Sequence, residues 1–222
     1  MPLPRALVLA GHGRYADHWH DHAATSHVLA GILGAAGLAV TVRGTFRQAF
    51  RDLRSFDLVV VNAGRGRPDP DFDGDDASWA GAHDAVRDYV SGGGALLGVH
   101  QAANTFGDSP HWAGLLGGRW VDGHSMHPPQ DLARFTPVGD HPIATGLGTV
   151  VADDEQYCEL VVEPDSRPFL VTEHEGREHP VAWVSAAGRV VYDALGHDVG
   201  SYASPSRVEL LRREIGWLLE PR

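Results

Sequence analysis

Short apolar runs alternate with longer amphipathic stretches along the first half of the chain. Near-continuous apolar runs predict strands at residues 6–10, 38–43, 57–62 and 95–100. Between these runs, residues 25–36 predict a helix that ends at Gly37. Asp76 is a candidate cap for a further helix, which ends at the glycines of residues 92–94. Buried strands separated by helices are typical of a parallel sheet that is covered on both faces.

The pattern changes after Gly117 to shorter extended segments. We expect them at residues 119–121, 133–138, 168–172, 181–185 and 188–195, with a hairpin turn at residues 186–188. Pro205 opens a closing amphipathic helix that carries Leu210, Leu211, Ile215 and Leu218. The sequence therefore predicts one α/β domain over residues 1–222, with a doubly wound, mostly parallel sheet and an antiparallel extension.

Charge and composition exclude several classes of partner. The formal net charge of −11 argues against nucleic acid and anionic membranes. All 18 cationic side chains are Arg, and without Lys the chain has neither a Schiff-base lysine nor a Walker phosphate loop. The single cysteine, Cys158, and the lack of a long apolar run lead us to expect a cytoplasmic protein; a homo-oligomer stays open.

Two known motifs are present only in part. Gly11 and Gly13 follow a strand, but the third glycine and the acidic residue of a dinucleotide site are missing, so we expect no nucleotide cofactor. Residues 69–75 match the first half of a calcium loop, but Ala80 occupies the position that needs a bidentate Glu. A solvated acidic turn is the favoured interpretation of this segment.

Histidines gather where the predicted strands end. Ligands of open parallel sheets bind beyond the carboxyl ends of the strands, and His100 closes the strand at residues 95–100. Hydrolytic α/β enzymes place a nucleophile at such a strand-to-helix elbow. A histidine at this position suits acid/base or ligand chemistry. A capped core histidine is the alternative.

A second group of histidines lies in the loop after the first strand. The run of His18, His20 and His22 could ligate a metal, because neutral imidazole is a common ligand of zinc and similar ions; His18 and His22 would share one face if the segment were helical. The alternative is a polar loop whose imidazoles bond to the backbone. His124 and His197 lie in later loops, where Glu155 and Tyr157 could supply acid/base and orienting groups.

Several short motifs in these segments resemble those of the ThuA-like family, named for trehalose utilisation. The matching stretches run in order over nearly the whole chain: GRYADHWHD at 13–21, GVHQAAN at 98–104, the glycines 117–118 through Gly123-His124, HPI at 141–143, DEQY at 154–157, PVAW at 180–183 and LGH at 195–197. The resemblance implies a fold similar to class I glutamine amidotransferases. Those enzymes carry a cysteine at the elbow, whereas this chain has His100 there, so thiol-based amidotransfer is not expected.

The resemblance also implies a role in carbohydrate metabolism, near disaccharides such as trehalose and their 3-keto derivatives. Our leading hypothesis is an enzyme that acts on a glycoside or its 3-keto derivative by histidine-based acid/base or metal-assisted chemistry. A non-catalytic sugar-binding or regulatory module is the alternative, and an amide hydrolase without cysteine ranks last. We assign the site residues as follows: catalytic His100, Glu155 and Tyr157; substrate-binding Arg14, Trp19, Gln101 and Asn104; and His18, His22, His124 and His197 for a divalent metal such as zinc.

Overall fold

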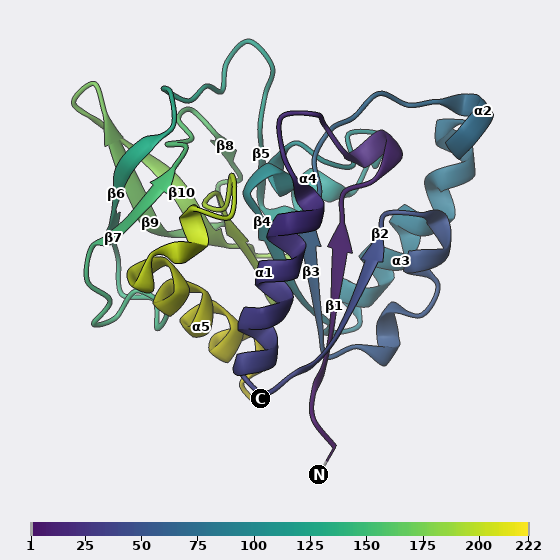
Figure 1. Ribbon diagram of the computed structural model, residues 1–222, viewed down its shortest axis with the longest axis horizontal. Coiled ribbons are helices and arrows are strands. Elements are labelled where there is room, and N and C mark those ends of the chain that lie inside the picture. The colour runs from purple at the N-terminus through teal and green to yellow at the C-terminus, as the bar shows by residue number, and fades with distance from the viewer. Residues whose placement is uncertain (1, 222) are drawn as a thin grey trace.

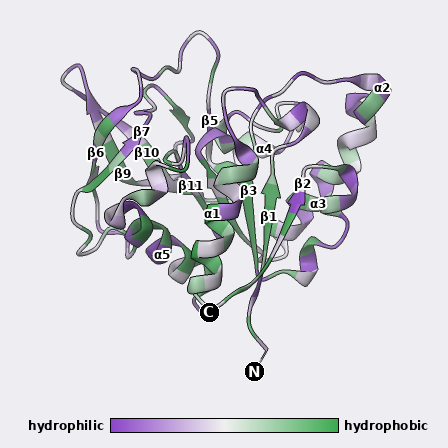
Figure 2. Cartoon of the chain, viewed as in Figure 1, coloured by the Kyte–Doolittle hydropathy of each residue, from purple (hydrophilic) through white to green (hydrophobic). Residues whose placement is uncertain are grey.

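Five parallel strands form one half of the central sheet in the computed structural model, which describes residues 2–221. They are β1 (Arg5–Ala10), β2 (Ala39–Gly44), β3 (Leu58–Asn62), β4 (Ala95–Val99) and β11 (Val190–Asp193). Their spatial order is β2-β1-β3-β4-β11, and the chain reverses its direction of winding after β2. The side chains of β1, β3 and β4 are almost wholly buried, which explains their continuous apolar runs. Figure 2 shows hydrophobic residues concentrated in β1 and β3.

The sheet continues beyond β11 through four antiparallel strands. They follow in the order β10 (Arg177–Val184), β9 (Arg167–His174), β6 (Asp131–Pro137) and β7 (Val150–Asp154). A separate pair joins β5 (Gly118–Arg119) to β8 (Val161–Val162). The predicted doubly wound, mostly parallel sheet with an antiparallel extension is confirmed (Figure 1).

Helices cover both faces of the parallel half (Figure 1). The helices α1 (His22–Ala35) and α5 (Pro205–Leu219) contact one another, and α3 (Ala80–Ser91) contacts α4 (Trp112–Leu116). A short helix, α2 (Pro70–Asp73), precedes α3. Single 3-10 turns are η1 (Gly13–Tyr15), η2 (Arg47–Phe50), η3 (Leu53–Ser55), η4 (Asp76–Trp79), η5 (His100–Ala103) and η6 (Ser201–Ala203). Of the helices described, none is long and apolar enough to cross a membrane.

Some boundaries differ from the sequence-based expectation. The helix expected at residues 25–36 begins at His22, because the Asp21 side chain caps it by accepting a hydrogen bond from the Ala24 N–H at 2.9 Å. The extended segment expected at residues 119–121 is reduced to the two residues of β5. The sequence analysis did not predict β7. This strand pairs with β6, and no local pattern in the sequence indicates that pairing.

A buried ion pair fixes α5 against the end of β11. The Arg207 guanidinium lies 2.6 Å from the Asp193 carboxylate, and both side chains are fully buried. Arg207 also donates a hydrogen bond to the Leu195 carbonyl oxygen at 3.0 Å. Glu214 lies in the same cluster, and burial raises its pKa well above the ordinary range, so its carboxyl group stays neutral. The cluster therefore contains one balanced pair of charges.

Replacing Arg207 by Met is expected to lower the free energy of unfolding by about 3–5 kcal/mol at neutral pH, because it removes the partner of a buried carboxylate. Arg212→Met is a matched control on the same helix, since Arg212 is exposed and forms no side-chain interaction within residues 2–221. We expect the control to change stability by less than about 0.5 kcal/mol. Urea unfolding measures both, and equal midpoints for the two variants would contradict this assignment.

Candidate metal centre

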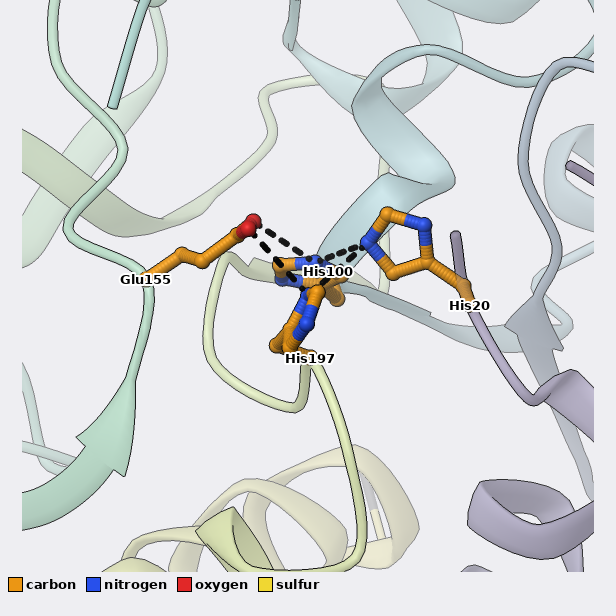
Figure 3. Close-up of side chains that lie close together, drawn as sticks. All are labelled: His20, His100, Glu155 and His197. Carbon is orange, nitrogen blue, oxygen red and sulfur yellow. Dashed lines mark hydrogen bonds and ion pairs between the residues drawn. The ribbon is translucent and has the colours of Figure 1, made fainter. Parts of the chain in front are cut away.

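Four side chains from four separate segments converge at one edge of the sheet (Figure 3). His20 follows β1, His100 follows β4, His197 follows β11, and Glu155 follows β7. Four antiparallel steps separate β11 from β7, so β7 points the same way as β11. All four side chains therefore lie beyond carboxyl ends of strands, where open α/β sheets bind ligands.

The nitrogen and oxygen atoms of this cluster are spaced as metal ligands are. His20 Nε2 lies 3.0 Å from His100 Nε2 and 3.0 Å from His197 Nδ1. Glu155 Oε1 lies 3.3 Å from His197 Nδ1, and Glu155 Oε2 lies 3.5 Å from His100 Nε2. Ligands held about 2.0–2.1 Å from a tetrahedral zinc ion are ~3.3 Å apart. The four atoms all lie within 4.8 Å of one another, which suits a single cation.

Hydrogen bonds on the far side of two rings set their tautomers. His100 Nδ1 lies 2.7 Å from the Ala194 carbonyl oxygen, which can only accept, so Nδ1 carries the proton. His20 Nδ1 likewise donates to the Asp17 carboxylate at 2.8 Å. If both rings are neutral, the lone pair on His20 Nε2 faces the lone pair on His100 Nε2, and the two nitrogens are 3.0 Å apart. These lone pairs repel unless a cation or a proton lies between them, and outward Nδ1–H bonds are the usual support of metal-binding histidines.

The pKa shifts differ among the members of the cluster: Glu155 raises the pKa of His197, whereas Glu155 and His20 are held deprotonated. Burial raises the pKa of Glu155, but the proximity of the His100 and His197 rings lowers it further, to below the ordinary range. Glu155 is therefore a carboxylate. Burial lowers the pKa of His20 and keeps that ring neutral near pH 7, despite the opposing effect of Asp17. Deprotonated side chains of this kind are the form that binds metals.

The backbone at His100 is held in an uncommon conformation. Its φ angle is +50°, in the left-handed region that non-glycine residues rarely occupy. The Tyr192 hydroxyl donates to the His100 carbonyl oxygen at 2.8 Å and holds this turn between β4 and η5. Gly98 allows the close packing below it, because a Cβ there would lie 2.6 Å from the Leu116 side chain. Strain of this kind costs about 1–3 kcal/mol and is often found at functional sites.

Asp154 connects the segments that carry Glu155 and His197. Its fully buried carboxylate accepts hydrogen bonds from the Gly196 N–H at 2.7 Å and the His197 N–H at 3.1 Å. It also accepts from the Ser201 hydroxyl and from the Glu155 N–H. One side chain thus holds the end of β7 and the loop after β11 at a fixed separation.

The cluster opens into a cavity of about 520 Å³, which we call the metal pocket. Tyr157 lies on its wall with the hydroxyl 3.1 Å from His100 Nε2, and burial raises the pKa of Tyr157 well above its ordinary value. The Trp120 ring packs edge-on against Tyr157 with centroids 4.9 Å apart. Trp19 is 75 % exposed at the rim. The pocket therefore combines polar groups with aromatic walls.

The structure gathers most of the residues singled out from the sequence. His100, Glu155 and His197 belong to the cluster, and the metal pocket is lined by Tyr157, Trp19, Gln101 and Asn104 as well. In the structure, His100 and Glu155 lie among the groups that could hold a metal ion, and the catalytic roles assigned to them from the sequence stay predictions.

Three of the expected metal ligands lie outside the cluster. His18 and His124 are exposed, and His22 is a buried ring whose centroid lies 6.0 Å from that of His20. The shared helical face assumed for His18 and His22 does not exist, because α1 begins only at His22. The structure thus places His20, and not these three histidines, beside the other members of the cluster.

Arg14, expected to bind substrate, is occupied by protein groups. Its side chain is 2 % exposed and pairs with Asp73, Asp76 and Asp108. Asp73 belongs to the acidic run at residues 69–75 that resembles half a calcium loop, and Asp76 follows it, so the Arg14 guanidinium pairs with one carboxylate of that run and with the next one along the chain. The other carboxylates of this run include Asp69 and Asp75, which cap α2 and η4.

Sequence reasoning named His20 in the histidine run but assigned His18 and His22 as ligands, and it gave His127 no role; His20 and His127 both line the metal pocket. The feature of the sequence that could have identified His20 is Asp17, three residues earlier. The Asp17 carboxylate accepts from the Trp19 N–H at 2.9 Å, and this local turn directs the His20 ring to the same carboxylate. His127 Nδ1 lies 3.5 Å from Glu155 Oε1, a contact with no local signal in the sequence.

Solved structures of low sequence identity share this fold. A ThuA-like protein from Parabacteroides merdae is 18% identical with a TM-score of 0.75, and the match covers 98% of this chain and 90% of that chain. A ThuA-like protein from Bacteroides uniformis is 17% identical with a TM-score of 0.74, covering 97% and 91% of the two chains. A glutamine amidotransferase from Thermotoga maritima is 10% identical with a TM-score of 0.61, covering 100% of both.

Two further comparisons use the sequence. No curated protein matches the chain significantly. The family described as "ThuA: Trehalose utilisation" matches residues 5–218, which include every residue of the cluster. The expected resemblance is thereby confirmed, and the chain belongs to the ThuA family.

Proposed function

We propose that this protein is a metal-dependent enzyme that acts on a glycoside or on its 3-keto derivative. The observation that carries the proposal is the convergence of three imidazole nitrogens and one carboxylate at the carboxyl edge of the sheet. Membership of a trehalose-utilisation family supports a carbohydrate-related role. The metal pocket has a volume of about 520 Å³ and is lined by polar groups and aromatic rings, which suits a small polar substrate.

The donor set indicates which ions would bind. Three imidazoles and one carboxylate suit zinc and similar first-row ions, whereas calcium and magnesium prefer oxygen ligands. His20, His100, His197 and Glu155 would hold the ion. A divalent ion bound there would supply Lewis-acid polarisation of a substrate or water oxygen, which would be a fifth ligand beside these four side chains.

Protein groups around the cluster would bind the sugar and move a proton. Burial keeps the Tyr157 phenol protonated, so its hydroxyl can donate a hydrogen bond or a proton to a sugar oxygen. Gln101 lines the metal pocket and donates to Asp17, and its buried Oε1 has no protein partner within residues 2–221. Trp19 and Trp120 offer ring faces for stacking.

Thiol chemistry is disfavoured by the position of Cys158. The side chain is buried, its Sγ donates to the Gln156 carbonyl oxygen at 3.3 Å, and burial raises the pKa of the thiol to about 11. A thiol of this kind is a poor nucleophile near neutral pH. The elbow position that holds a cysteine in amidotransferases carries His100 in this chain.

Metal content is the first test. Untagged wild-type protein is expected to bind about one equivalent of zinc, and His20→Ala is expected to weaken binding at least ~100-fold because it removes one of four ligands. His18→Ala, two residues away and exposed, is the matched control and should bind zinc as the wild type does. Elemental analysis and chelator competition measure the difference. An equal loss of zinc affinity in both variants, or no loss in either, would contradict the proposed ligand set.

The contacts of Asp154 predict a role in positioning the ligands. Asp154→Asn keeps the shape of the side chain but removes its charge and one acceptor, so we expect zinc affinity to fall about 10–100-fold. The neighbouring exposed Asp153 gives the control, Asp153→Asn, which should not change affinity. A thermal-stability loss in Asp154→Asn with unchanged zinc affinity would show a purely structural role.

Turnover separates an enzyme from a sugar-binding module. Glycosides and 3-keto-glycosides can be screened with the zinc-loaded protein by mass spectrometry. For any compound converted, Tyr157→Phe is expected to lower kcat by about 10²–10⁴-fold while zinc content is unchanged, because it removes only the hydroxyl. Undiminished kcat would remove Tyr157 from the reaction. Zinc-dependent sugar binding without conversion across the panel would favour the binding module.

A further inference from the structure

A cavity of about 490 Å³ lies between η2 and α3, and we call it the arginine pocket. One wall comes from η2 and the residue after it, and the other from η4 and α3. The lining residues are Arg47, Gln48, Phe50, Arg51, Ser78, Gly81, Ala82 and Ala85. None of them lines the metal pocket, and the function proposed above gives this cavity no role.

The two arginines of the arginine pocket carry charges that no protein group balances. Within residues 2–221, the side chains of Arg47 and Arg51 form no ion pair and no hydrogen bond. No Asp or Glu lies on the lining. The pocket is therefore a cationic hollow on a chain whose formal net charge is −11.

The acidic residues of the neighbouring segments are engaged by other groups. Their ion pairs are Asp52 with Arg43, Asp76 with Arg14, and both Asp84 and Asp88 with Arg87. Asp75 caps η4 by accepting a hydrogen bond from the Ser78 N–H at 3.0 Å. An anion in the arginine pocket would thus meet two guanidinium groups and no carboxylate on the lining.

Further donors surround the two guanidinium groups. A Cβ placed on Gly74 would lie 3.8 Å from Arg47 Nη1 and 2.5 Å from Ser78 Oγ, so the Arg47 guanidinium reaches toward the segment before α3. The side-chain amide of Gln48 has no protein partner among the described residues. Gly81 lies in the first turn of α3, where the partial positive charge of a helix N-terminus favours anions.

A phosphate group matches this arrangement. Each planar guanidinium can donate two parallel N–H···O bonds to phosphate, and two of them balance a dianion. A carboxylate carries a single charge and would leave one arginine unbalanced. The cavity is larger than a phosphate ion, and the buried side chains of Phe50 and Ala82 give it an apolar floor for a small carbon skeleton.

We propose that the arginine pocket binds a phosphate group, with Arg47 and Arg51 as the two phosphate-binding residues. The group would come from a small phosphate monoester or from inorganic phosphate, which offer the same oxygens to the arginines. The proposal does not depend on the metal-dependent function, because the arginine pocket shares no residue with the metal ligands.

Four variants test the assignment. Arg47→Gln and Arg51→Gln each remove one positive charge from the pocket. Gly81→Asp adds a negative charge there without weakening the fold, because a Cβ at Gly81 meets nothing within 4 Å and a carboxylate is favourable in the first turn of a helix. Arg54→Gln is the matched control: Arg54 is exposed, forms no side-chain interaction within residues 2–221 and does not line the arginine pocket.

Titration calorimetry at low ionic strength measures the binding of inorganic phosphate, glycerol 3-phosphate and glycerol, before and after zinc loading. We expect the wild type to bind at least one of the two phosphates with a Kd of about 1 mM or tighter, and not to bind glycerol. Arg47→Gln and Arg51→Gln should each weaken phosphate binding about tenfold, and Gly81→Asp should weaken it further. Arg54→Gln should change it by less than about twofold.

The zinc arm separates the arginine pocket from the metal pocket, where phosphate could bind to the metal. Binding at the arginine pocket should be the same with and without zinc, and the same in His20→Ala as in the wild type. Tighter binding of glycerol 3-phosphate than of inorganic phosphate would support the pocket and identify a monoester as its ligand. The reverse order would support it with inorganic phosphate as the ligand.

Three results would overturn the proposal. They are no binding of either phosphate, an equal loss of affinity in Arg54→Gln and in the two pocket variants, and binding that requires zinc. The first two leave the metal-dependent function untouched, since that function makes no use of the arginine pocket.

Discussion

Because β7 runs in the same direction as β1, β4 and β11, Glu155 follows its strand at the edge of the sheet where the three histidines follow theirs. An odd number of antiparallel steps would place this carboxylate at the opposite edge of the sheet. The parallel half alone supplies three imidazoles, and the extension supplies the negative charge that balances a cation. The antiparallel strands thus complete the site as well as widening the sheet.

Bringing three imidazole rings together costs free energy, because their lone pairs repel one another. The contacts of residues 193–197 offset this cost. Asp193 and Leu195 are held by Arg207, the Ala194 carbonyl orients His100, and Gly196 and His197 donate to Asp154. Nearly every residue of this short segment therefore has a fixed partner. The buried charges beneath the site anchor the loop that brings His197 to the other ligands, which links the stability of α5 to the geometry of the site.

The parts of this arrangement that follow from local pattern could be predicted from the sequence. Continuous apolar runs identify the parallel strands, and His100, Glu155 and His197 were found because each lies at or near a strand end or in a polar loop of that edge. The choice between His18, His20 and His22 could not be made in this way. It depends on a turn in which Asp17 bonds to Trp19 and His20, whereas the prediction assumed helical spacing. The pairing of β7 with β6 and the contact of His127 with Glu155 arise only in three dimensions.

The elbow after β4 shows how one fold can serve different chemistry. Its left-handed backbone and the close packing at Gly98 depend on the sheet and on α4, not on which side chain the elbow residue carries. A histidine here places Nε2 toward the cluster only because Ala194, at the end of the neighbouring strand, takes up Nδ1. A cysteine has no second polar atom to be oriented in this way. The orientation of His100 therefore depends on the carbonyl beside it, and the arrangement of the site follows from the whole edge of the sheet rather than from a single residue.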